Sequence, residues 1–162
     1  MMFETERCSL SLFKESDSAA VSNLFTNPEV RKYLGGIRDA DSLKETLEDM
    51  LDPQPGSYYW VVREKSTKDF IGLISLDSHH EGIDQEVSYQ LLPDWWGRGY
   101  AAETVAMIID FALNILKLPA VVAETQSENI PSCRLLEKLG MELERKVFRY
   151  GAEQRLYAIR TI

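Results

Sequence analysis

The chain has 162 residues and a net charge of −8 at pH 7, since 18 Lys and Arg oppose 26 Asp and Glu. This length suits one domain with its own core, so we expect a single domain over residues 1–162. Hydrophobic residues make up 44% of the chain, as in ordinary globular proteins. The acidic balance argues against a nucleic-acid partner, because binding phosphates requires clustered Lys and Arg.

Further classes are excluded by what the sequence lacks. No apolar run approaches the ~18–20 residues that span a bilayer, so no membrane partner is expected. The first residues lack the basic and then apolar pattern of a secretory signal, which predicts a cytoplasmic location. Cys8, Cys133, His79 and His80 show no metal-ligand spacing, so we expect no metal site.

The first third of the chain predicts one strand and three helices. Residues 7–14 alternate between polar and apolar side chains and predict a strand. Asp17 is expected to cap a helix, Pro28 to begin a short one, and Asp41 to open a longer one. The apolar face of this longer helix comprises Leu43, Leu47, Met50 and Leu51.

The middle of the chain changes to the period of strands. Segments 58–62, 70–76 and 86–92 are joined by short polar turns and predict an antiparallel meander. A long helix then covers about 99–117, and its few polar positions, among them Glu103, form one stripe, which is typical of a helix buried against a sheet.

The last third predicts a strand at 120–125, a helix at 129–139 that Gly140 ends, and two strands at about 142–150 and 154–160. The order is neither alternating βαβ nor all-β. We therefore expect an α+β (mixed α/β) fold with helices on both faces of a mixed sheet, whose parallel part lies near the long helix.

The loop between the third meander strand and the long helix predicts an anion site. Gly97 and Gly99 allow a tight turn that exposes backbone N–H groups at the positive end of the helix, and Arg98 adds a charge. We expect a phosphate or pyrophosphate at residues 97–102. Three interpretations remain: a plain connection, a dinucleotide site of an oxidoreductase, and a coenzyme A site. The preceding meander disfavours the dinucleotide site.

Five segments together resemble the GCN5-related N-acetyltransferases (GNAT superfamily), in particular the branch that acetylates ribosomal proteins and small amines. They are residues 4–10 (ETERCSL), 86–89 (EVSY), 96–103 (WGRGYAAE), 129–132 (NIPS) and 137–140 (EKLG). The resemblance implies a central, mostly antiparallel twisted sheet of about seven strands with a splayed parallel pair. It also implies acetyl-CoA-dependent transfer of an acetyl group to a primary amine by direct attack in a ternary complex.

The resemblance also implies which residues hold the coenzyme. The strand that ends at Leu91 and Leu92 would bind the pantetheine arm, Asn129 the coenzyme's amides, and Ser132 would lie near the thioester sulfur. The pyrophosphate would lie at the loop formed by Trp96, Gly97, Arg98, Gly99, Tyr100, Ala101 and Ala102. The alternative for Asn129 and Ser132 is a helix cap. Arg134 and Lys138 could touch a phosphate, although we favour a solvated face shared with Glu137.

Acetyl transfer to an amine needs a base, an oxyanion donor and an acid. Glu86 is our candidate base, provided that burial raises its pKa toward neutrality; otherwise it is an exposed carboxylate that attracts amines. Asp94 is the lesser rival. The backbone N–H of Leu92 is the expected oxyanion donor. Ser132 is the candidate acid, because Leu136 stands where many members of the family carry a tyrosine.

Two other reactive groups are given structural interpretations. Cys133 is expected to be a small buried residue and no nucleophile. His79 and His80 could assist deprotonation, but a turn is the simpler interpretation.

The acidic residues are uneven along the chain. They concentrate in segments 39–52 and 69–94, which in the resembled family flank the acceptor opening. An acidic rim would attract a small amine or a protein N-terminus, and the alternative is charge that serves only solubility. A non-catalytic acyl-CoA sensor is the competing function, and a homodimer is open.

Overall fold

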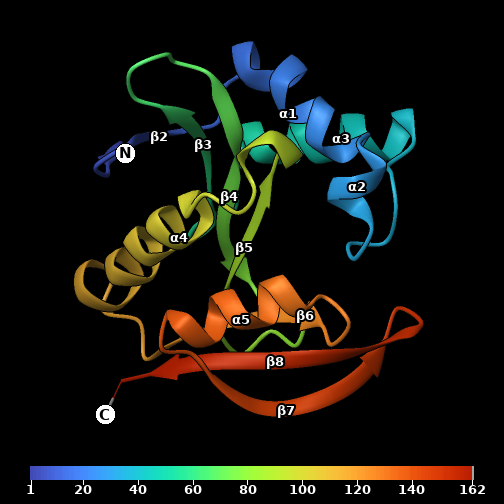
Figure 1. Ribbon diagram of the computed structural model, residues 1–162, viewed down its shortest axis with the longest axis vertical. Helices are drawn as coiled ribbons and strands as arrows, with labels where there is room; N and C mark the ends of the chain where they lie inside the picture. Colours follow the sequence, from blue (N-terminus) through green and yellow to red (C-terminus); the bar gives the residue numbers. More distant parts are fainter. Residues whose placement is uncertain (162) are drawn as a thin grey trace.

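The protein is built on one twisted sheet, described over residues 1–161 in a computed structural model (Figure 1). Eight strands follow the order β1-β2-β3-β4-β5-β6-β8-β7. They are β1 (Phe3–Glu4), β2 (Cys8–Leu12), β3 (Tyr58–Glu64), β4 (Phe70–Ser78), β5 (Gln85–Leu91), β6 (Ala120–Gln126), β7 (Glu142–Arg149) and β8 (Ala152–Arg160). All neighbours are antiparallel except β5 and β6. The expected mixed sheet with a parallel pair is therefore confirmed.

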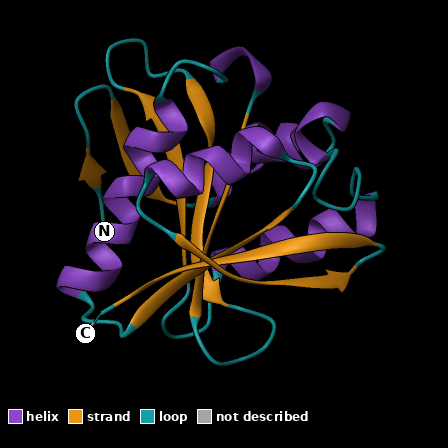
Figure 2. Ribbon diagram, turned by 60° about the horizontal axis from the view of Figure 1, so that its bottom comes forward, coloured by secondary structure: helices purple, strands orange, loops and turns teal. Residues whose placement is uncertain are grey.

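Helices cover both faces of this sheet, as Figure 2 shows. They are η1 (Glu15–Asp17), α1 (Ser18–Phe25), α2 (Pro28–Arg31), α3 (Ala40–Leu51), η2 (Pro93–Trp95), α4 (Tyr100–Asp110), the π-helical turn η3 (Phe111–Ile115) and α5 (Ile130–Lys138). Asn27 caps α2 by accepting N–H bonds from Glu29 and Val30. This cap fixes where the short helix begins.

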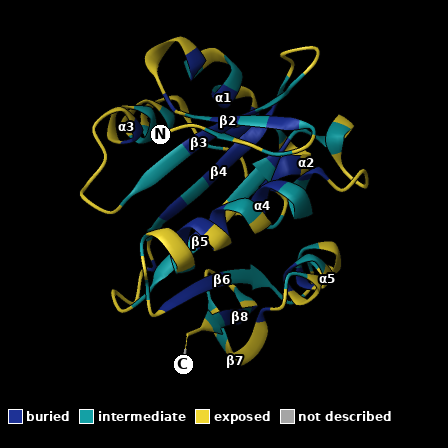
Figure 3. Ribbon diagram, turned by 90° about the vertical axis from the view of Figure 1, so that its left-hand side faces the viewer, coloured by how far each residue is buried: buried dark blue, intermediate teal, exposed yellow. Residues whose placement is uncertain are grey.

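The core consists of two large clusters and a small third one on β6 and β8. Ile74 and Leu76 of β4 pack in one cluster with Val105 and Ile108 of α4. Leu73 packs in the other large cluster, which lies beneath α1 and α3. Since successive side chains alternate between faces, the central strands β3 and β4 present one set of residues to α4 and one to α1–α3. Figure 3 shows buried residues concentrated along the central strands.

The same alternation orients the side chains of β5. Val87, Tyr89 and Leu91 belong to the α4 cluster. Glu86, Ser88 and Gln90 therefore point to the opposite face, and Gln90 indeed contacts Arg31 of α2. Side chains on the two faces of β5 therefore contact different halves of the molecule.

The parallel pair β5–β6 is very short. Only Gln85 pairs with Val121 and Glu86 with Val122, whereas β6 and β8 pair over seven positions. Beyond Glu86 the two strands diverge, so the unpaired edge of β5 borders an opening through the sheet.

Several predicted boundaries are wrong for local reasons. Strand β1 was not predicted, because two residues carry too little pattern. Asp39, and not Asp41, caps α3 by accepting the N–H of Ser42, and Leu51 at its end is exposed. Asp17 makes no side-chain cap to α1; its carboxylate binds Arg63 at 2.8 Å.

Among residues 1–161, none of the helices combines the length and the apolar character that crossing a bilayer requires.

Candidate active site

A cavity of about 1020 Å³ lies at the opening between β5 and β6. One half is lined by the loop before α4, the first turn of α4, and α5. The other half is lined by α2, α3 and the α1–α3 face of β4 and β5. The cavity is therefore reached from both faces of the sheet.

The glycine loop has the geometry of an anion site. Gly97 and Gly99 have φ angles of 70° and 82°, which glycine adopts without the strain that a side chain would add. Among residues 1–161, the amides of 97–102 have no protein acceptor, and they precede or open the eleven-residue helix α4. Free N–H groups at a helix N-terminus bind phosphate oxygens, so the residues present fit the pyrophosphate of coenzyme A.

A half-buried network that sequence reasoning missed holds this loop in place. Glu103 accepts hydrogen bonds from Thr5 Oγ1 at 2.5 Å and Arg7 Nε at 2.8 Å. Arg7 also donates to the carbonyl of Arg98 at 3.0 Å and stacks 3.9 Å from the ring centroid of Tyr100. Glu103 had only been placed in a polar stripe, because its partners lie almost a hundred residues away.

Arg98 and Trp96, which were expected to bind the coenzyme, make hydrogen bonds within the protein instead. The guanidinium of Arg98 donates to the carbonyl of Asp94 at 3.0 Å and lies over Trp95, so among described residues it is not part of the cavity wall. Trp96 Nε1 donates to the carbonyl of Leu91 at 2.8 Å. Trp96 therefore occupies one of the strand's polar groups that pantetheine was expected to use. Tyr100, Ala101 and Ala102 line the cavity.

The N-terminus of α5 combines a cap with a cavity wall. Asn129 Oδ1 accepts the N–H of Ser132 at 3.3 Å, which is the capping role considered above. Both residues line the cavity, so the Asn129 amide nitrogen remains there as a donor. Arg134 and Lys138 line it as well, and Glu137 binds Tyr157 instead of them. Arg134, Glu137 and Lys138 are all exposed, so the solvated face that we favoured is present, and two of its members also line the cavity.

Ser132 has a tyrosine partner that the sequence did not reveal. The hydroxyls of Tyr89 and Ser132 lie 2.5 Å apart, and both line the cavity. Burial raises the pKa of Tyr89 to about 12, against the opposing effect of the Ser132 hydrogen bond. Tyr89 is thus protonated at neutral pH. Leu136, where a tyrosine was missing, is fully buried, whereas Tyr89 of β5 lines the cavity.

Glu86 meets the condition set for a base. Burial, assisted by the Asp77 and Glu124 carboxylates, raises the pKa of Glu86 to about 8. Its Oε2 accepts the N–H of Glu124 at 3.2 Å. Among described residues, its neighbours Asp77 and Glu124 line the cavity, whereas Glu86 lies just behind them. This position suits proton transfer through a water better than direct contact.

Asp77 joins Glu86 as a second carboxyl with a raised pKa. It lies opposite Glu86 in the β4–β5 ladder, and Tyr59 donates to it at 3.1 Å. Burial raises its pKa, which the Tyr59 hydrogen bond only partly offsets. Asp94, the earlier rival, is exposed on η2.

The expected oxyanion donor is already hydrogen-bonded within the sheet, so the Leu92 expectation is wrong. The Leu92 N–H donates to the carbonyl of Ile71 at 2.9 Å, so it is already satisfied by β4. In an antiparallel ladder the N–H groups of alternate residues point to opposite sides. The N–H of Leu91 therefore points away from β4, toward the opening.

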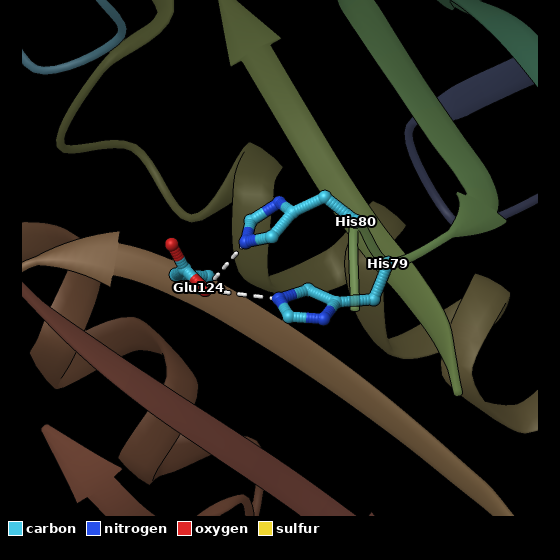
Figure 4. A group of neighbouring side chains, drawn as sticks. All are labelled: His79, His80 and Glu124. Atoms are coloured by element: carbon cyan, nitrogen blue, oxygen red, sulfur yellow. Dashed lines mark hydrogen bonds and ion pairs between the residues drawn. The ribbon is translucent and has the colours of Figure 1, made fainter. Parts of the chain in front are cut away.

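His79, His80 and Glu124 form a cluster beside the cavity (Figure 4). Glu124 Oε1 lies 2.9 Å from His79 Nε2 and 3.4 Å from His80 Nε2, and Arg149 binds its Oε2. The three ligand atoms lie within 4.8 Å of one another. However, His79 Nδ1 accepts the N–H of Glu81, so the ring proton lies on Nε2, where a metal would bind. The cluster is a hydrogen-bonded unit in this protonation state.

Cys133 has the environment expected of a structural residue. It is buried, its Sγ donates to the carbonyl of Gln126, and among described residues it is not part of the cavity wall.

The comparisons with known proteins agree with this architecture. The family described as "Acetyltransferase (GNAT) domain" matches residues 7–142. The uncharacterized N-acetyltransferase YoaA of Bacillus subtilis is 28% identical over 88% of this chain and 84% of its own. Among solved structures, the ribosomal-protein-S5-alanine acetyltransferase from Vibrio fischeri has a TM-score of 0.83 at 21% identity, over 99% of this chain and 96% of that one.

A further solved structure is spermidine N-acetyltransferase from Vibrio cholerae in complex with CoA and spermine. Its TM-score is 0.80 at 21% identity, over 94% of this chain and 95% of that one. The chain belongs to the GNAT acetyltransferase family, and its fold is the GNAT fold. It is therefore an acetyltransferase, of a family that uses acetyl-CoA.

Proposed function

We propose that this protein transfers an acetyl group from acetyl-CoA to a primary amine, either a protein N-terminus or a small amine, in a ternary complex. One observation carries the proposal: a single cavity joins the anion-binding loop to the carboxyls of Asp77 and Glu124, which are the neighbours of Glu86. The solved relatives that are named for spermidine and for ribosomal-protein alanine support an amine acceptor.

The coenzyme and the base Glu86 lie on opposite faces of β5. The loop amides and α5 hold the coenzyme on the α4 side, where Tyr89 and Ser132 also lie. Glu86 lies on the opposite face and takes the ammonium proton through a water, since only the neutral amine is a nucleophile. The Leu91 N–H stabilises the developing oxyanion. The Tyr89 hydroxyl, backed by Ser132, donates a proton to the departing thiolate.

Release of free coenzyme A tests this function. The purified protein is mixed with acetyl-CoA and a panel of amines and peptides, and thiol release is followed with a chromogenic reagent. We expect turnover with at least one primary amine and none with matched N-acetylated acceptors. Tight binding of coenzyme A without any transfer would replace the proposal with a non-catalytic acyl-CoA sensor.

Replacing Gly99 with Ala should weaken coenzyme A binding about tenfold. An added Cβ would lie 3.3 Å from Arg7 Nη2 at a φ of +82°, and an L-residue in the left-handed region costs about 1–2 kcal/mol. Calorimetric titration with coenzyme A measures the effect. Gly140→Ala is the matched control, because Gly140 has a φ of +89° with nothing within 4 Å. It should lower stability but not affinity; equal losses in affinity would count against the loop.

A further inference from the structure

Four of the ten arginines have no carboxylate within 4.0 Å among residues 1–161. They are Arg31, Arg38, Arg98 and Arg134. The other six all form ion pairs. Arg98 belongs to the anion-binding loop and Arg134 lies on the coenzyme half of the cavity wall, where phosphates are expected. The remaining two line the acceptor half, where the proposed acetyl transfer needs no cation.

Arg31 is a buried charge with neutral partners only. The residue is 5% exposed. Its guanidinium donates to the carbonyls of Gly36 at 2.9 Å and Leu34 at 2.6 Å, and to Gln90 Oε1 at 3.1 Å. Burial and the nearby Arg38 lower the pKa of Arg31 to about 10. A buried cation without a counter-ion is costly, so a ligand that supplies one would bind strongly.

Arg38 adds a second cation to the same wall. Its Nη1 donates to the hydroxyls of Ser42 at 2.9 Å and Thr46 at 3.1 Å. Both guanidinium carbons lie against the ring of Phe25, Arg31 at 5.3 Å and Arg38 at 5.7 Å from its centroid. The two guanidinium groups therefore lie beside the same aromatic ring. Neither has a carboxylate partner among residues 1–161, although the chain carries a net charge of −8.

The hydrogen-bond inventory of Arg31 indicates what would bind there. A guanidinium has five N–H groups, and three are used by Gly36, Leu34 and Gln90. One N–H remains on each terminal nitrogen. Two such donors match the two oxygens of a carboxylate, the bidentate pairing in which arginine excels.

We propose that Arg31 and Arg38 bind a carboxylate carried by the acceptor, whose amine end points toward Glu86. This inference rests on the proposed acetyl transfer to an amine. Gln90, which contacts Arg31, and Glu86 lie on the same face of β5, four residues apart, or about 13 Å along the strand. The acceptor is therefore an extended amino acid or a peptide with an acidic group some distance from its amine, and not a polyamine.

Matched acceptors of graded length test the proposal. The kcat/KM of ω-amino acids, from 4-aminobutanoate to 8-aminooctanoate, is compared with that of amino alcohols and diamines of equal length. We expect the carboxylate to be preferred about 10- to 100-fold, because hydrogen bonds between charged groups are stronger than those between neutral ones. Arg38→Gln should reduce this ratio about tenfold. Arg155→Gln, which alters an arginine outside the cavity, should leave the ratio unchanged.

A binding measurement separates this inference from the proposed function. Calorimetry with glutarate should show binding to the wild type that weakens in Arg38→Gln and in Arg31→Lys, a variant that keeps the buried charge but loses the fork. Glutarate binding without any acetyl transfer would overturn the proposed function and leave the carboxylate site standing. Faster acetylation of diamines than of ω-amino acids, with the ratio unaffected by Arg38→Gln, would overturn the carboxylate site alone.

Discussion

Replacing Glu86 with Gln is expected to lower kcat/KM about 10²- to 10⁴-fold, the usual effect of removing a general base. The pKa of Glu86 is raised to about 8 by burial and by the neighbouring carboxyls. The wild-type rate should therefore rise with pH and level off above about pH 8, where Glu86 is ionised. The variant should lose this rise. An acceptor whose own amine pKa lies above about 10 stays protonated across this range, so Glu86 still has a proton to remove and the acceptor's titration stays out of the profile.

Two further variants make the Glu86 result interpretable. Asp77→Asn removes the carboxyl that lines the cavity beside Glu86, and Asp94→Asn removes an exposed one. We expect Asp94→Asn to be nearly silent. If Asp77→Asn abolishes the pH dependence while Glu86→Gln retains it, Asp77 is the base and our assignment is wrong.

The raised pKa of Glu86 also makes the free energy of unfolding depend on pH. In the unfolded chain Glu86 titrates near the ordinary value of about 4.3, whereas in the folded protein it titrates at about 8. The folded state then holds a proton that the unfolded chain has released, so the free energy of unfolding falls as pH rises through this window. Urea unfolding should show this fall in the wild type and a smaller one in Glu86→Gln.

Replacing Tyr89 with Phe is expected to reduce kcat about 100-fold, near the lower end for a lost general acid because a thiolate is a fair leaving group. The coenzyme should still bind, since only a hydroxyl is lost. Ser132→Ala should have a smaller effect, because Tyr89 keeps its proton. The two hydroxyls lie 2.5 Å apart, so the double variant should be little worse than Tyr89→Phe alone.

Tyr157 supplies the matched control for Tyr89. Burial raises the pKa of Tyr157 to about 12 as well, and its hydroxyl donates to Glu137 at 2.7 Å. Among described residues it does not line the cavity. Tyr157→Phe should leave kcat unchanged. A kcat for Tyr89→Phe within twofold of the wild type, or a loss confined to KM, would show that the Tyr89–Ser132 pair only supports the structure.

The features that could be predicted from the sequence depend on patterns of neighbouring residues. Gly97 and Gly99 precede an amphipathic helix, and this pattern within a few residues was enough to predict the anion-binding loop. The strand and helix order followed from hydrophobic period in the same way. The family resemblance then supplied a role for Glu86, with burial as a stated condition.

The contacts that could not be predicted from the sequence join residues far apart in the chain. Tyr89 meets Ser132 across 43 residues, and His79 meets Glu124 across 45. No local spacing encodes such contacts. Leu92 shows a different limit: the strand was predicted, but which amides face the opening depends on the ladder with β4. A shift of one residue exchanges the two sets.

The short pairing of β5 with β6 also means that other contacts must set the width of the cavity between these strands. Because backbone bonds join the strands at two positions only, side-chain packing of α4 on β5 and of η3 on β6 must keep the strands apart. The sheet therefore consists of two leaves that backbone pairing between β5 and β6 joins only at Gln85 and Glu86. Core substitutions on α4, such as Ile108→Val, would therefore alter coenzyme affinity from a distance, by changing the angle between the leaves.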